Sequence, residues 1–87
     1  MIDRLHSPES EQSVIGGLLL DASAIDRIGA LRPQHFFAEA HRAIFGAILA
    51  MSAESQPIDA VTVAERLEAD GKSELSGGLA YLGQLAA

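Results

Sequence analysis

The sequence contains no cysteine, and its six basic residues stand against twelve acidic ones. Without cysteine, neither a disulfide framework nor a thiolate metal site can form, and this absence is typical of a cytoplasmic protein. The longest apolar run, Val14–Leu20, is much shorter than a bilayer-spanning helix, so we expect no membrane segment. The N-terminus also lacks the basic segment and apolar stretch of a signal peptide.

The shortage of basic residues argues against direct nucleic-acid binding. The net charge is −6, and the arginines are scattered along the chain rather than gathered in one stretch. A domain that binds DNA or RNA normally presents a basic face to the phosphates. We therefore expect the partner of this chain to be another protein.

The apolar spacing predicts an all-α domain, a compact bundle of about five or six short helices. We expect residues 1–87 to form a single domain in which residues 1–6 are a flexible arm. Ser7 and Pro8 signal the start of a helix that runs to about Leu20. A short helix is predicted next, through Leu31, ending before Pro33. Asp59 reads as the N-cap of a later helix that stops at Gly71, and residues 78–87 form the last helix.

The strongest helical pattern lies between these segments. One face carries the large residues Phe37, His41, Ile44, Phe45, Ile48 and Leu49. A second row carries the small residues Ala43, Gly46, Ala47 and Ala50. We interpret this as a central helix contacted on both faces, with a neighbouring helix close against the small residues.

Two adjacent glycines interrupt the first helix, although each costs a helix interior roughly 1 kcal/mol relative to alanine. We interpret Gly16 and Gly17 as a flat surface that packs against the small-residue row of the central helix. Glu11 falls on the apolar side of the same helix, where a carboxylate needs a partner. Arg42 or His41 would serve, and we favour a Glu11–Arg42 salt bridge.

Two apparent chemical motifs are better explained as structure. Residues 71–73 read Gly-Lys-Ser, the tail of a phosphate-binding loop, but Arg66 stands where that loop needs its first glycine. His35 and His41 are six residues apart, which does not place them on one helical face for a metal. No serine, histidine and acid ordering indicates a catalytic site. We therefore expect no catalytic residue, metal or cofactor in this chain.

Four blocks of sequence, in this order, resemble the N-terminal domain of DnaB-type bacterial replicative DNA helicases. They cover nearly the whole chain, from about His6 to Leu85, with small departures such as His35 where the family has aspartate. The blocks are His6-Ser7 with Glu9–Asp21, Phe36-Phe37 with His41–Phe45, Pro57–Asp59 with Val61–Leu67, and Gly77–Leu82.

The resemblance implies a part in DNA replication. Members of this family assemble into hexameric rings, with their N-terminal domains as a trimer of dimers, and the parent is an ATP-dependent 5′–3′ DNA helicase. ATP and Mg²⁺ bind in a RecA-like motor domain, which is missing from these 87 residues, as is the helical hairpin that normally follows. The implied partners are other subunits, primase and a helicase loader. An alternative is a stand-alone module of phage type that binds or inhibits a helicase.

The last helix is rich in apolar residues, which suggests an interface. We predict that Asp59, Leu79, Tyr81 and Leu82 contact another subunit. The alternative is that these residues complete the core or face the hairpin.

Overall fold

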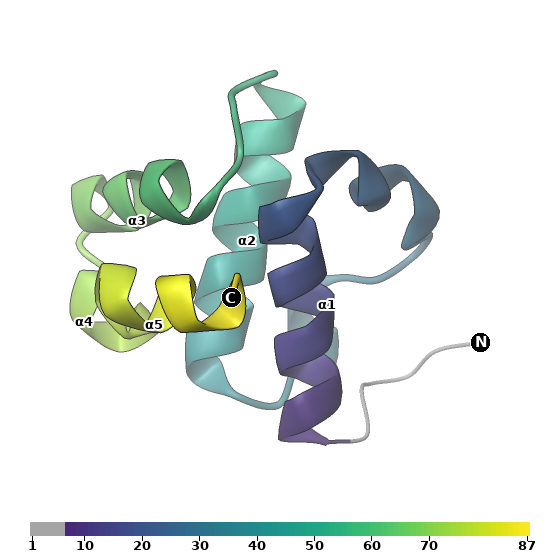
Figure 1. Ribbon diagram of the computed structural model, residues 1–87, viewed down its shortest axis with the longest axis horizontal. Helices are drawn as coiled ribbons and strands as arrows, with labels where there is room; N and C mark the ends of the chain where they lie inside the picture. The colour runs from purple at the N-terminus through teal and green to yellow at the C-terminus, as the bar shows by residue number, and fades with distance from the viewer. Residues whose placement is uncertain (1–6) are drawn as a thin grey trace.

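Seven helical segments make up the computed structural model, which describes residues 7–87 (Figure 1). The segments are α1 (Pro8–Leu20), η1 (Ala22–Arg27), η2 (Pro33–His35), α2 (Glu39–Ala53), α3 (Ala60–Ala69), α4 (Ser73–Ser76) and α5 (Gly78–Leu85). The described part of the chain contains no strand, so the predicted all-α class is confirmed. The arm predicted for residues 1–6 lies outside the described residues.

Helix α1 begins and ends where its local signals predict. The Ser7 hydroxyl accepts a hydrogen bond from the backbone N–H of Ser10 at 3.1 Å, and Pro8 occupies the first turn. At the other end, the Asp21 carboxylate accepts from the N–H of Ser23 at 3.1 Å and starts the 3₁₀ helix η1. Because η1 stops at Arg27, the prediction of a helix through Leu31 was wrong.

The central helix starts later than its apolar spacing predicted. Phe37 lies before α2 and is 75% exposed, so its assignment to the buried face was wrong. The Glu11 carboxylate explains this start, because it accepts hydrogen bonds from the N–H groups of Phe37 and Ala38. These bonds hold the segment extended, with Ala38 at φ −74° and ψ 131°.

Helix α2 lies at the centre of the domain and contacts α1, η2, α3 and α4. Figure 1 shows α1 alongside α2, while α3 runs crosswise to α2 at its left and α5 lies below α3. The interior joins side chains from α1, α2, α3 and α5 around Phe36, Phe45, Ile44 and Ile48, which are at most 1% exposed. The rest of the buried apolar core is Ile15, Leu18, Leu19, Leu31, Ala47, Met51, Val63, Leu67 and Leu82.

The C-terminal half is organised by its caps. The Asp59 side chain accepts from the N–H of Thr62 at 2.8 Å, and the Thr62 hydroxyl accepts from the N–H of Asp59 at 2.9 Å. This reciprocal pair confirms Asp59 as the N-cap of α3. After α3 comes the one-turn helix α4, which the apolar spacing did not predict. Gly77 then turns the chain into α5 with φ +90°, a conformation that a residue with a side chain rarely adopts.

The two glycines of α1 have different surroundings, and neither faces the small-residue row of α2. A Cβ at Gly16 would lie closer than 3.0 Å to the carbonyl oxygen of Leu85, at the end of α5. Gly17 has nothing within 4 Å of such an atom. The prediction that both glycines pack against Ala43, Gly46 and Ala47 was therefore wrong. Gly16 makes room for the backbone of α5, and nothing in residues 7–87 explains Gly17.

Candidate interaction site between α1 and α5

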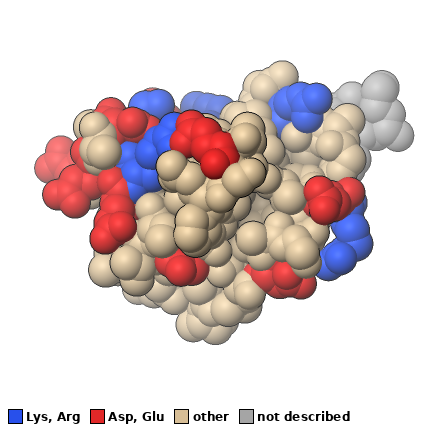
Figure 2. All heavy atoms as spheres, turned by 90° about the horizontal axis from the view of Figure 1, so that it is seen from above, with Lys and Arg blue, Asp and Glu red and all other residues tan. Residues whose placement is uncertain are grey.

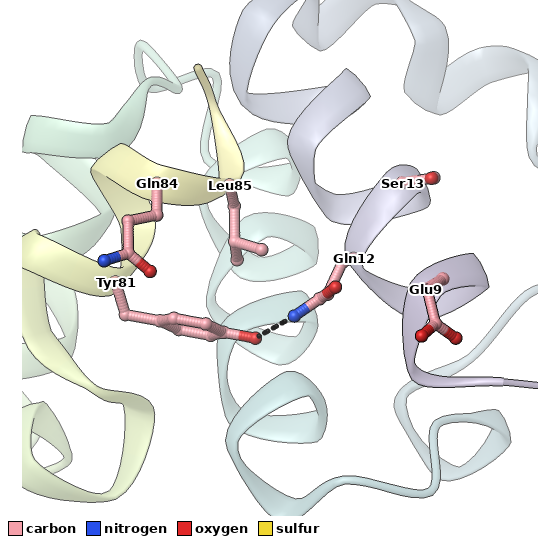
Figure 3. Close-up of a pocket in the computed structure, with 6 residues that line it drawn as sticks. All are labelled: Glu9, Gln12, Ser13, Tyr81, Gln84 and Leu85. Carbon is pink, nitrogen blue, oxygen red and sulfur yellow. Dashed lines mark hydrogen bonds between the residues drawn. The ribbon is translucent and has the colours of Figure 1, made fainter.

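A groove of about 480 Å³ lies between α1 and α5. Figure 3 shows Glu9, Gln12 and Ser13 on the α1 side and Tyr81, Gln84 and Leu85 on the α5 side. The Gln12 amide and the Tyr81 phenol meet across it, where the amide donates to Oη at 3.2 Å. This contact connects the open groove with a polar network inside the domain.

The network joins three helices through Glu11, Gln12, His41 and Tyr81. Nδ1 of His41 lies 2.7 Å from Oε1 of Glu11, and Nε2 lies 2.5 Å from the Tyr81 hydroxyl. With a neutral imidazole, the hydrogen bonds run in one direction: Gln12 donates to Tyr81, Tyr81 to His41, and His41 to Glu11. The imidazole and phenol rings are also nearly parallel, at 9°, with centroids 5.8 Å apart.

Glu11 is held as a buried carboxylate. Its side chain is only 2% exposed, and burial on its own raises the pKa of a carboxyl group. Hydrogen bonds from His41 and from the backbone N–H groups of Phe37 and Ala38 act in the other direction and bring the pKa of Glu11 below its ordinary value. The carboxylate is therefore ionised at neutral pH and ties α1 to α2 and to the segment before it.

The geometry gives this network a structural role. Within residues 7–87, each buried polar side-chain atom has a hydrogen-bond partner. Both imidazole nitrogens are hydrogen-bonded, one to Glu11 and the other to Tyr81. In this arrangement neither nitrogen is available to activate a nucleophile in the groove. Removing one member would leave its neighbour buried without a partner, which typically costs about 1–3 kcal/mol.

Arg42 does not pair with Glu11, so the favoured salt bridge was wrong and His41 is the partner. The Arg42 guanidinium instead donates through Nη1 to the carbonyl oxygens of Phe36 (3.1 Å) and Phe37 (2.7 Å). Arg42 is thus a clamp on the chain that enters α2. Both candidate partners of Glu11 on the central helix were visible in the sequence, and only the three-dimensional path of residues 36–38 decides between them.

The predicted interface residues have different surroundings. Leu79 is 52% exposed, and Asp59 is exposed while its carboxylate caps α3. Tyr81 is half-buried and lines the groove. Leu82 is completely buried in the core, which removes it from the interface and supports the alternative that it completes the core.

Two residues of this region were missed by sequence reasoning. Gln12 carries the link from the groove to the network, but a glutamine on a predicted helix gives no signal of its own. Leu75 is 42% exposed on α4, next to the start of α5. An apolar side chain within the polar stretch of residues 72–76 was a signal that could have drawn attention to it.

Within residues 7–87, the other sequence motifs, residues 71–73 and the histidines, are not arranged to bind a nucleotide or a metal. Residues 71–73 follow the end of α3 and enter the one-turn helix α4, which is not the strand, loop and helix of a nucleotide-binding motif. Nδ1 of His35 accepts from the N–H of Arg32 at 2.9 Å, so this histidine closes η2. Between Ser7 and Ala87, histidine and acidic side chains form no group that could hold a metal ion. None of the described helices is both long and apolar enough to cross a membrane.

Charged side chains of both signs share the surface. Figure 2 shows acidic and basic groups crowded together at its left, the side on which α3 and α4 lie in Figure 1. One contributor is Arg66, whose guanidinium pairs with Glu54 at 3.0 Å and with Asp70 at 3.2 Å. These hydrogen bonds raise the pKa of Arg66 above its ordinary value. Interspersed charges of this kind do not form the continuous basic face of a nucleic-acid-binding domain.

Together, the fold and the site define a small helical domain in which a buried polar network and a glycine contact hold the last helix against the first. Comparisons with known proteins place this domain in a family. The model of the DnaB-like helicase N terminal domain matches residues 3–87. The chain belongs to this family.

Relatives with known names agree with this assignment. Replicative DNA helicase DnaB from Buchnera aphidicola subsp. Schizaphis graminum is 41% identical over 81 residues, and that from Geobacillus stearothermophilus is 40% identical over 81 residues. Each alignment covers 92% of this chain but only 17% and 18% of the respective relative. The crystal structure of the N-terminal domain of DnaB helicase from Mycobacterium tuberculosis is similar with a TM-score of 0.88 and 40% identity, covering 95% of this chain and 58% of that one.

Proposed function

We propose that this chain serves as the N-terminal head of a replicative DNA helicase, where it supports assembly of the ring and recruits primase or a helicase loader. The observation that carries the proposal is the family match over residues 3–87. It is supported by the likeness to the DnaB N-terminal domain from Mycobacterium tuberculosis at a TM-score of 0.88. In the proposed parent, ATP and Mg²⁺ are bound elsewhere, and this head contributes protein contacts in the cytoplasm.

The subunit contact is proposed for the surface around α4 and the start of α5. Leu75 and Leu79 place two partly exposed leucine side chains there, at 42% and 52%. When a partner covers an exposed apolar side chain, the free energy falls by roughly 25 cal/mol for each Å² of apolar surface buried. Asp59 and Tyr81 remain in the proposed interface as polar members, a combination that suits the rim of a protein contact.

A chimera tests this function. In the helicase from Geobacillus stearothermophilus, the 81 residues that align with this chain would be replaced by it. We expect the chimera to form hexamers by native mass spectrometry, to unwind a forked DNA with ATP, and to respond to the Geobacillus primase. A folded chimera that stays monomeric would contradict the assembly role.

The isolated chain provides the comparison for the alternative function. Added in excess to the intact Geobacillus helicase, it is expected to leave unwinding largely unchanged. Strong inhibition in trans, combined with a chimera that does not assemble, would favour the stand-alone module that binds or inhibits a helicase.

A further inference from the structure

A second groove, of about 250 Å³, lies between α2 and the end of α3. Three of the six basic residues in the chain line it, although the net charge is −6. The complete lining is Arg42, Ala43, Gly46, Ala47, Ala50, Arg66, Leu67, Asp70 and Lys72. Positive charge is thus concentrated at one hollow of an otherwise acidic molecule.

Two of these three cations have capacity left for a ligand. Arg66 is neutralised, because both of its Nη atoms bind Glu54 and its Nε binds Asp70. Within the described part of the chain, Arg42 uses only Nη1, which donates to two backbone carbonyls. Lys72 makes no ion pair among residues 7–87.

The floor of the groove is the small-residue row of α2, which the sequence had assigned to close contact with another helix. At Gly46, helix α1 does not cover that row. Among residues 7–87, a Cβ built on Gly46 would meet only the Pro33 ring, at 4.0 Å. Small residues spaced three and four apart allow the backbone of a second helix to approach closely.

We propose that this groove docks a helix of a partner protein that carries an aspartate or glutamate, whose carboxylate is held between Arg42 and Lys72. Guanidinium and ammonium groups both bind carboxylates through charge-assisted hydrogen bonds. A single carboxylate suits the site better than a nucleic acid does, because Asp70 stands in the wall and the whole chain repels a polyanion. The groove shares no lining residue with the proposed subunit contact, and this proposal does not depend on the helicase function.

Two blocked, alanine-rich helical peptides of about 16 residues provide the probe, one with a central glutamate and the other with glutamine in its place. Each is titrated into the ¹⁵N-labelled 87-residue chain and followed by NMR. We expect saturable shifts at Ala43, Gly46 and Ala50 with the glutamate peptide, and binding about tenfold weaker with the glutamine peptide. Absence of saturable shifts, or equal binding of both peptides, would overturn the proposal.

Variants and a competing ligand sharpen the result. Lys72→Gln, at an exposed side chain, should weaken the glutamate peptide about tenfold, and Gly46→Leu should block it. Gly83→Leu is the matched control on α5, where an added Cβ meets nothing within 4 Å, and it should bind normally. Tighter binding of a single-stranded oligonucleotide than of the glutamate peptide, with shifts at the same residues, would assign the groove to nucleic acid and refute a protein partner.

Discussion

Replacing Gly16 with alanine tests the contact that docks the last helix on the first. The new Cβ would lie closer than 3.0 Å to the Leu85 carbonyl oxygen and 3.2 Å from its carbonyl carbon. Both atoms belong to the backbone, so no side chain can rotate away and the end of α5 must shift. Overpacking of this kind typically costs about 1–3 kcal/mol.

Gly17→Ala is the matched control, one residue further along the same helix. No atom of the described residues, 7–87, lies within 4 Å of its added Cβ. Both variants gain roughly 1 kcal/mol from the higher helix propensity of alanine, but only Gly16→Ala meets the backbone of α5. The free energy of unfolding of the two variants should therefore differ by about 1–3 kcal/mol in favour of Gly17→Ala.

Thermal and urea unfolding followed by circular dichroism measure this difference. In a domain of this size, each kcal/mol moves Tm by about 4–8 °C. We expect Gly17→Ala to melt above the natural sequence and Gly16→Ala to melt well below Gly17→Ala. The reasoning is refuted if both substitutions raise Tm equally.

Three further predictions concern the network and the cap. Because the pKa of Glu11 is lowered, its carboxylate contributes to stability above about pH 4.5, and this contribution is lost as the pH falls below that value. Glu11→Gln should therefore flatten this part of the pH dependence of the urea midpoint. A curve parallel to that of the natural sequence would contradict the role of Glu11. Tyr81→Phe should lower the free energy of unfolding by about 1–3 kcal/mol, because His41 and Gln12 lose the hydroxyl as a hydrogen-bond partner. Urea unfolding of this variant measures the decrease. An unchanged free energy of unfolding would show that water replaces the hydroxyl at no cost. Asp59→Ala should cost about 0.5–2 kcal/mol in the same assay, whereas Asp59→Asn should retain most of the stability because its side chain can still accept from Thr62.

Signals that act over a few residues were readable in the sequence. The hydroxyl of Ser7 and the carboxylate of Asp59 cap helices that begin directly after them, so the starts of α1 and α3 could be predicted. Gly71 likewise follows the end of α3, with φ +73°. Each of these features depends on hydrogen bonds or backbone angles set by neighbouring residues.

Features that depend on distant segments could not be read in this way. The start of α2 is set by Glu11, which lies 26 residues before Phe37. The partner of Gly16 is the backbone of Leu85, and a backbone contact leaves no trace in the side-chain pattern. For the same reason the sequence signalled that Glu11 needs a partner but did not choose between His41 and Arg42.

In the proposed function, α5 forms part of a surface through which subunits assemble. The most direct test is the mass, measured by light scattering, of the Geobacillus chimera that carries Leu79→Asp. Leu20→Asp is the control, because Leu20 is 68% exposed on α1. The account predicts hexamers for the unmodified chimera and for Leu20→Asp, and smaller species for Leu79→Asp. A full hexamer with Leu79→Asp would contradict it.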